Sequence, residues 1–170
     1  MKKNFDIKKI VIPIFLLMFG MMTVSGFAQE MPVPVNLQAA LFKKIFAFDK
    51  TLQSKGNVEV AVLTGSGSGD DIVSAFKAAG VNVKAVSGDQ VPDGVSVVYV
   101  MPGVKPPKQV CSQKGVLSIS GVPSYAETGG VSVALSVENG KPQISINMKE
   151  LKAEGQDMSA DLLRLAKIIQ

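Results

Sequence analysis

Histidine and tryptophan are absent from all 170 residues, and cysteine occurs once, at Cys111. Without histidine the chain forms no Ser-His-Asp triad or Cys-His dyad, and it lacks the commonest metal ligand. One cysteine makes no intramolecular disulfide, so we interpret it as a buried apolar residue, the alternative being a disulfide between two chains. No Asp/Glu group has calcium-loop spacing. We therefore expect a protein that is not an enzyme, with no catalytic residues, metal or cofactor.

The first 28 residues have the layout of a secretory signal peptide. Four lysines precede an apolar run at residues 10–24, and small residues follow at Gly26 and Ala28. A transmembrane anchor is the alternative, but a span needs about 20 apolar residues and this run is shorter. No cysteine stands directly after the run, which argues against a lipid anchor. We expect cleavage after Ala28.

The basic character of the chain comes mainly from this leader. The net charge is +4, but residues 1–28 hold four lysines and one aspartate, so the remainder carries +1. That charge predicts no nucleic-acid partner. The mature chain fits one domain: prolines predict an extended lead-in over residues 29–35, and we expect a single domain over residues 36–170.

Apolar residues recur at helical spacing after Asn36, which predicts one amphipathic helix over residues 37–53 with Asn36 as its N-cap. The stripe expected to face the core is Leu37, Ala40, Leu41, Lys44, Ile45, Phe48 and Leu52. The phenylalanines at 42, 46 and 48 are interpreted as core residues rather than as a ligand cage.

A strand, a glycine-rich turn, a helix and a second strand follow. Val58–Leu63 is apolar and β-branched, Asp70 or Asp71 can cap the helix, and Gly80 suits the position after its last turn. With the second strand at residues 81–86 this is a βαβ unit, which joins two parallel strands by a right-handed crossover.

Residues 94–101 are almost continuously apolar, which is typical of a central strand covered on both faces. The sequence KPPK, residues 105–108, is interpreted as a surface turn leading into a short helix, with a proline-rich ligand motif as the alternative. Residues 116–120 predict another strand, and turn residues predict a loop over residues 121–130.

Asn139-Gly140 is the strongest hairpin signal in the chain, because a type I′ turn needs positive φ at both central positions. Alternating apolar residues flank it at residues 131–136, Ile144 and Ile146.

Two helices end the chain, the first stopping at Gly155 and the second capped by Asp157 or Ser159. The expected apolar face of the last helix is Leu162, Leu163, Leu165, Ala166 and Ile169. Together these elements predict a three-layer α/β fold. Its mixed, mostly parallel sheet carries a C-terminal β-hairpin and flanking helices.

Loops after parallel strands meet at the carboxyl edge of a sheet, where α/β proteins usually bind ligands. Here they are residues 64–69, 101–104 and 121–130. The first lies in TGSGSGDD, which has neither dinucleotide-fingerprint spacing nor a P-loop lysine, and whose aspartates, Asp70 and Asp71, would repel a phosphate. A flexible turn before a capped helix is the favoured interpretation, and a small polar ligand is the alternative.

The candidate partner or ligand residues in these loops are Gly65, Ser66, Gly67, Ser68, Tyr125 and Glu127. For Tyr125 the favoured interpretation is a half-buried ring whose hydroxyl reaches solvent.

Residues 124–169, SYAETGGVSVALSVENGKPQISINMKELKAEGQDMSADLLRLAKII, resemble the C-terminal half of the YfiR-like family of secreted bacterial proteins. The shared pattern is Gly129-Gly130, a strand pair ending at Ile146-Asn147, a helix ending at Gly155, and Ser159–Ala166. The first helix, LQAALFKKIFAF, also resembles that of the family.

The resemblance implies a periplasmic repressor. Well-known members bind the periplasmic sensor domain of a membrane diguanylate cyclase, hold it inactive, and are sequestered by an outer-membrane-associated partner. This chain lacks the Trp-Pro after the first helix, the cysteine pairs and the ligand-linked histidines of those members, so no contact residue is transferred.

We therefore expect a non-enzymatic periplasmic regulator of cyclic di-GMP signalling. Its partner would be the extracytoplasmic domain of a membrane signalling protein, a cyclase or a sensor kinase. The expected surfaces are residues 65–71, residues 121–128 and any apolar strip left exposed on the first helix. The alternative is a small-molecule binding module using the carboxyl-edge loops, and a homodimer stays open.

Overall fold

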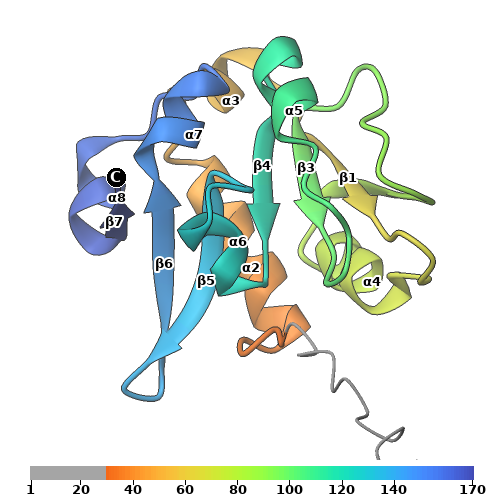
Figure 1. Cartoon of the computed structure of the whole chain (residues 1–170), viewed down its shortest axis with the longest axis horizontal. Helices are drawn as coiled ribbons and strands as arrows, with labels where there is room; N and C mark the ends of the chain where they lie inside the picture. The colour runs from red at the N-terminus through yellow and green to blue at the C-terminus, as the bar shows by residue number, and fades with distance from the viewer. Residues whose placement is uncertain (1–29) are drawn as a thin grey trace, which may run out of the picture.

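Seven strands form one mixed sheet in the order β2-β1-β3-β4-β5-β6-β7 (Figure 1). This computed structural model describes residues 30–170, so the predicted signal peptide lies outside the described residues. The strands are β1 (Glu59–Leu63), β2 (Asn82–Val86), β3 (Val97–Val100), β4 (Leu117–Ser120), β5 (Val133–Glu138), β6 (Lys141–Asn147) and β7 (Lys167–Ile169). All neighbours are parallel except β5 and β6, which are antiparallel. The predicted fold class is confirmed.

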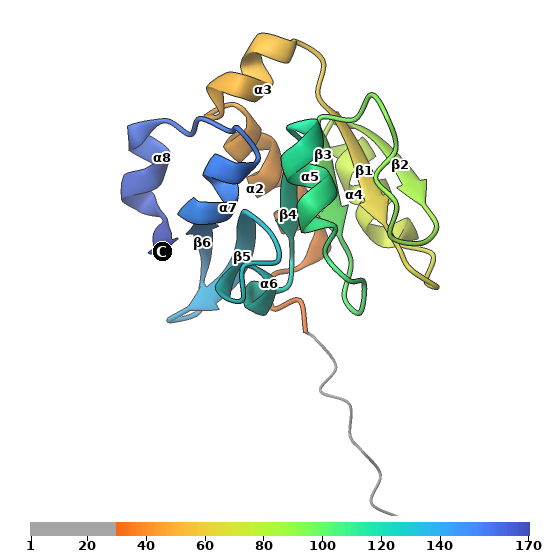
Figure 2. The same ribbon diagram turned by 45° about the horizontal axis from the view of Figure 1, so that its top comes forward.

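Helices cover both faces of the sheet, which makes three layers (Figure 2). The helices are α2 (Val35–Phe46), α3 (Lys50–Lys55), α4 (Asp70–Ala78), α5 (Lys108–Lys114), α6 (Pro123–Glu127), α7 (Met148–Ala153) and α8 (Ala160–Leu165). Strand alternation divides the core in two. Val60, Val97 and Tyr99 pack with α2 and α4, whereas Ala61 and Val98 pack beneath α5 and α6.

The predicted helix over residues 37–53 is wrong as one element, because it breaks between α2 and α3. Asp49 is extended and its side chain caps α3, accepting from the N–H groups of Thr51 at 2.8 Å and Leu52 at 3.1 Å. Asp49 also forms a β-bridge with Met158, so the break docks onto the C-terminal segment. A cap and a bridge at one residue outweigh the local helical pattern.

The predicted core stripe of this segment is also rotated. The buried face of α2 consists of Gln38, Ala39, Phe42, Ile45 and Phe46, not of the stripe that begins at Leu37. Phe42 and Phe46 are core as predicted, but Phe48 is 41% exposed. Asn36 is not the N-cap; Pro34 occupies that position without a side-chain cap.

The βαβ unit is confirmed, with β1 and β2 parallel and α4 between them. Gly80 has φ +73° and follows the last turn, and the next residue donates to Phe76 O at 3.0 Å, which closes a Schellman motif. The expectation that Asp70 or Asp71 caps α4 is wrong, because Gly69 is the N-cap and no side chain caps the helix. The two aspartates instead lie in the first turn, where their charge suits the helix dipole.

The C-terminal half follows the prediction with two additions. Asn139 and Gly140 both have positive φ and close the β5–β6 hairpin as a type I′ turn. The loop predicted over residues 121–130 contains the short helix α6. The predicted last helix ends at Leu165, which is 72% exposed, and the chain continues into β7 beside β6.

A buried hydrogen-bond system joins the lead-in, α2 and the sheet centre. The Tyr99 hydroxyl donates to Gln38 Oε1 at 2.6 Å, and Gln38 Nε2 donates to Val33 O at 2.6 Å. The Tyr99 ring packs edge-on against Phe42 and Phe76 at centroid distances of 5.9 and 5.8 Å. Burial raises the pKa of Tyr99, so its hydroxyl remains a neutral donor. The lead-in is therefore anchored in the core.

Gly121 leaves the space that this system occupies. A Cβ at that position would lie 2.7 Å from the Tyr99 hydroxyl and 2.7 Å from Gln38 Nε2. We expect Gly121→Ala to lower the free energy of unfolding by about 1–3 kcal/mol, because overpacking displaces buried partners. Urea denaturation measures this change in the free energy of unfolding. Gly67→Ala is the matched control, since its Cβ would meet only Thr64 O at 3.4 Å. Equal stability of the two variants would contradict the prediction.

Candidate functional site

β1 and β3 are neighbours at the point where the strand order reverses. The chain runs outward from β1 to β2, then returns past β1 to β3, and in α/β folds ligands bind at such a switch point. A crevice of about 330 Å³ lies there between two loops, residues 64–67 and 101–104. Two of the three predicted carboxyl-edge loops thus meet.

Two of the three glycines of the 64–69 loop are explained by backbone geometry. Gly65 and Gly69 have φ of +59° and +65°, a region that side chains other than glycine rarely adopt. Gly65 also exchanges two backbone hydrogen bonds with Gly88, which fixes the loop against the end of β2. This supports a structural turn as the first role of the GSGSG sequence.

The six predicted site residues do not form one site. Gly65, Ser66 and Gly67 line the crevice, and Ser68 lies in the same loop but outside its lining. Glu127 lies in α6, where its carboxylate is 3.6 Å from Lys167 Nζ of β7.

Tyr125 supports the 101–104 side of the crevice. Its ring is 6% exposed and its hydroxyl donates to Val104 O at 2.9 Å, so the expectation that this hydroxyl reaches solvent is wrong. Burial raises the pKa of Tyr125, which keeps the hydroxyl a neutral donor. The residue holds the 101–104 loop in place.

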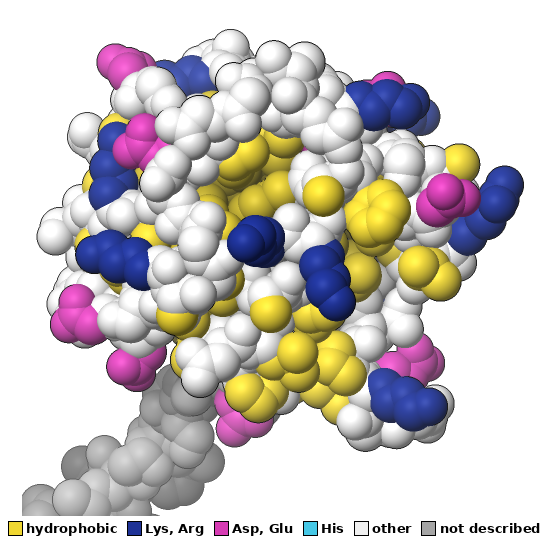
Figure 3. All heavy atoms as spheres, turned by 180° about the vertical axis from the view of Figure 1, so that it is seen from behind, with side chains coloured by type: hydrophobic (Ala, Val, Ile, Leu, Met, Phe, Trp, Pro, Cys, Tyr) yellow, Lys and Arg dark blue, Asp and Glu magenta, His cyan; other side chains and the backbone are white. Residues whose placement is uncertain are grey.

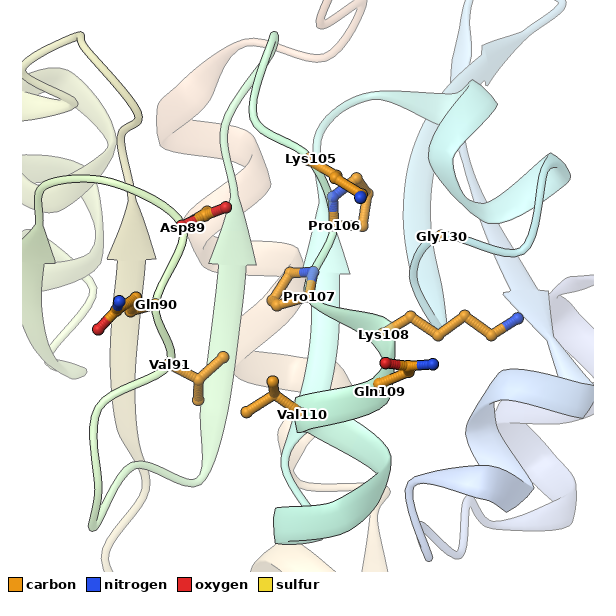
Figure 4. Close-up of a pocket in the computed structure, with 10 residues that line it drawn as sticks. All are labelled: Asp89, Gln90, Val91, Lys105, Pro106, Pro107, Lys108, Gln109, Val110 and Gly130. Carbon is orange, nitrogen blue, oxygen red and sulfur yellow. The ribbon is translucent and has the colours of Figure 1, made fainter.

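A larger cleft lies on the face covered by α5, and the sequence did not point to it as a site. It measures about 800 Å³ and runs between residues 89–91 and the start of α5 (Figure 4). Val91 and Val110 face each other across it, and the ring of Pro107 borders it. The KPPK segment forms one wall of the cleft. It leads directly into α5, so the predicted surface turn into a helix is confirmed.

An ion pair between the exposed Lys108 and a buried carboxylate fixes the α5 side of this cleft. Lys108 Nζ lies 2.6 Å from Glu150 Oε1, and Glu150 is 3% exposed. The Glu150 N–H donates to Asn147 Oδ1 at 3.1 Å, and Asn147 Nδ2 donates to Ala126 O at 2.9 Å. The Lys108 charge is thereby directed toward α7 and away from the cleft (Figure 4).

Glu154, after the last turn of α7, is a second buried carboxylate. Its oxygens accept from the Ser118 N–H at 3.0 Å, from the Ser118 hydroxyl, and from the Ser132 hydroxyl at 2.5 Å. Burial nevertheless raises its pKa to about 7, against an ordinary value of 4.5. Cys111 also lies in this core, and burial first, then the Glu154 charge, raises the pKa of its thiol to about 12. The expectation that Cys111 is buried is confirmed.

The face that α2 covers leaves apolar side chains in contact with solvent (Figure 3). Leu37 is 40% exposed, Leu41 is half-buried and Phe48 is 41% exposed. We call these three residues the α2 strip. They belong to the stripe that the sequence placed in the core. Leu37 and Leu41 lie on α2 and Phe48 follows its end, and together they form an apolar strip of the kind that the sequence named as a partner surface.

Neither a metal site nor a membrane span is found in the described part of the chain. Among residues 30–170 no group of three or more His, Cys, Asp or Glu side chains could hold a metal ion. In the same range no helix is long and apolar enough to cross a membrane.

The sequence matches the model of a protein family described as YfiR/HmsC-like over residues 36–167. That range runs from the first turn of α2 into β7. A comparison with curated proteins found no match.

Glu154 gives the fold a specific dependence on pH. Because its pKa is raised in the folded chain, its contribution to stability is complete below pH 4.5 and is lost as the pH rises through about 7. The free energy of unfolding that is lost over this pH range is on the order of 3 kcal/mol. We expect Glu154→Gln, which stays neutral, to gain stability relative to the natural chain over this window.

Urea denaturation of both chains across the window measures this difference. Glu138→Gln, at the exposed end of β5, removes an equal charge from an exposed site and should track the natural chain. A constant difference between the Glu154→Gln variant and the natural chain at every pH would contradict the prediction, because it would mean that folding leaves the pKa of Glu154 unchanged.

Proposed function

The chain belongs to the YfiR/HmsC-like family, and from this membership we propose that it is a non-enzymatic periplasmic regulator that acts by binding a membrane signalling protein. The observation that carries the proposal is the extent of the match, which spans nearly all the described elements. We propose further that the signal peptide is cleaved after Ala28 and that residues 36–170 form a single regulatory domain.

The finer proposal concerns the partner. It is the extracytoplasmic domain of a diguanylate cyclase, which the protein represses and so lowers cyclic di-GMP; a sensor kinase is the other class of partner. An outer-membrane-associated protein would release the repression by sequestering this chain. Support comes from the family and from the lack of histidine, which leaves few routes to catalysis.

The α2 strip is the surface we assign to this partner. Interfaces are built on apolar and aromatic side chains that are buried only in the complex. Leu37, Leu41 and Phe48 offer such side chains beside the helix face that packs on the sheet. Removal of Leu37 and Phe48 leaves the core face of α2 in place, because Phe42 and Ile45 on that face are buried.

Deletion of the gene should raise intracellular cyclic di-GMP, and re-expression of the natural chain should lower it again. We expect the double variant Leu37→Ser/Phe48→Ser to fold, with stability changed by about 0.5 kcal/mol or less per site, yet to fail to restore repression or to capture the cyclase domain. Cyclic di-GMP assays and pull-downs from membranes measure the two effects.

Leu165→Ser is the matched control, because it removes a more exposed leucine from a different helix, α8. It should repress normally. Loss of repression with Leu165→Ser alone would move the interface to the C-terminal helix. Unchanged cyclic di-GMP on deletion, with no membrane signalling protein captured, would refute the regulatory function itself.

The switch-point crevice favours a second candidate function, a small-molecule binding module. Its support is the strand order and the meeting of residues 64–67 with residues 101–104. A thermal-shift screen with nucleotides and other small polar molecules tests it. We expect Ser66→Trp, which fills the crevice from an exposed position, to abolish any shift, whereas Ser74→Trp on the exposed side of α4 should not. No shift at millimolar ligand would exclude this module.

A further inference from the structure

We propose that the cleft between residues 89–91 and the start of α5 binds a zwitterion with an apolar body, such as a free apolar amino acid or a short apolar peptide with free ends. This proposal does not depend on the regulatory function proposed above. The cleft and the α2 strip lie on opposite faces of the sheet, because Val91 and Val110 belong to the core beneath α5.

Each wall of the cleft contributes apolar side chains to its lining. Val91 is 6% exposed and faces Val110 across the cleft, and the Pro107 ring borders the same space (Figure 4). A volume of about 800 Å³ lies within the range of small-molecule sites, which are typically lined by apolar groups with a few polar groups that set orientation. An apolar ligand body would therefore lose contact with water here.

Two charges of opposite sign flank the cleft from its two walls. Asp89 extends from the loop after β2 toward the wall that carries Lys105 (Figure 4). Within residues 30–170 neither side chain forms an ion pair or a hydrogen bond, with the other or with any third group.

The neighbouring lysines, by contrast, are already in ion pairs. Lys108 is paired with Glu150 at 2.6 Å, and Lys114 is paired with Asp93 at 2.7 Å. Asp89 and Lys105 are thus the two charges left to a ligand, one on each wall.

A zwitterion matches this arrangement better than an ion of one sign. An anion attracted by Lys105 would be repelled by Asp89, and a cation attracted by Asp89 would be repelled by Lys105. A ligand with an ammonium group and a carboxylate pairs with both side chains through charge-assisted hydrogen bonds, and its apolar body covers Val91 and Val110. Discrimination then comes from repulsion as well as attraction.

Isothermal titration calorimetry on the mature protein tests the proposal with leucine, leucyl-leucine, and the N-acetyl and C-amide forms of each. We expect at least one free zwitterion to bind, and each blocked form to bind at least about tenfold more weakly, because one charge is left unpaired. The better of the two free ligands identifies the source, amino acid or peptide.

Crossed variants assign each charge to its partner. Asp89→Asn should abolish the preference for a free ammonium group and keep the preference for a free carboxylate, and Lys105→Gln should do the opposite. Both side chains are exposed, so both variants should fold, which circular dichroism checks. Glu138→Gln and Lys149→Gln, charges outside the cleft lining, are the matched controls and should bind like the natural chain.

Three results would overturn the proposal: no binding of any free zwitterion at millimolar concentration, equal binding of free and blocked forms, or cleft variants that behave like the controls. None of these bears on repression of a cyclase, which is measured in cells through the α2 strip. Loss of repression with intact ligand binding, or the reverse, therefore separates the two proposals.

Discussion

The Tyr99 hydroxyl is a polar group at the centre of an apolar core, and much of the structure is arranged around its pairing. A buried hydroxyl without a partner costs free energy, so Gln38 must be presented from α2 at hydrogen-bond distance. Gln38 in turn needs an acceptor for its own amide, and Val33 of the lead-in supplies it. Gly121 must stay without a side chain to leave them space. One phenol thus fixes the rotation of α2, the course of the lead-in and the end of β4.

The same pairing explains why the sequence misplaced the core face of α2. Apolar spacing alone ranks Leu37 and Leu41 as core and a glutamine as surface. The structure buries Gln38 because a partner for it exists on β3, 61 residues further along the chain. Local patterns contain no information on such a partner. Strand positions, by contrast, were predictable, because β1, β3 and β4 are nearly or wholly buried and their apolar, β-branched composition suffices to define them.

Turn and cap chemistry was predictable where one residue type is required, as at Asn139-Gly140 and Gly80. The prediction of caps and helix ends failed where a distant segment determines the end of a helix. Asp49 is an example, because its β-bridge to Met158 ends a helical run. The candidate site shows the same division. Loops 64–67 and 101–104 were placed together from topology alone, whereas the pairing of Tyr125 with Val104 and the cleft of Asp89 and Lys105 depend on how α5 and α6 pack. No short motif marks those contacts.

The two faces of the sheet set what a ligand could do to a partner. A molecule in the cleft touches the α5 side, and a protein on the α2 strip touches the other, so neither can displace the other by contact. Coupling would have to cross β3, whose residues are fully buried and packed on both faces. A strand packed closely on both faces resists rearrangement, so it offers little means of carrying a structural change from one site to the other. The flanking loop at residues 89–91 and the α5 wall are less constrained, yet the Lys108–Glu150 pair ties α5 to α7 rather than to α2. The geometry therefore favours independent sites, and partner affinity measured with and without a bound zwitterion should be the same.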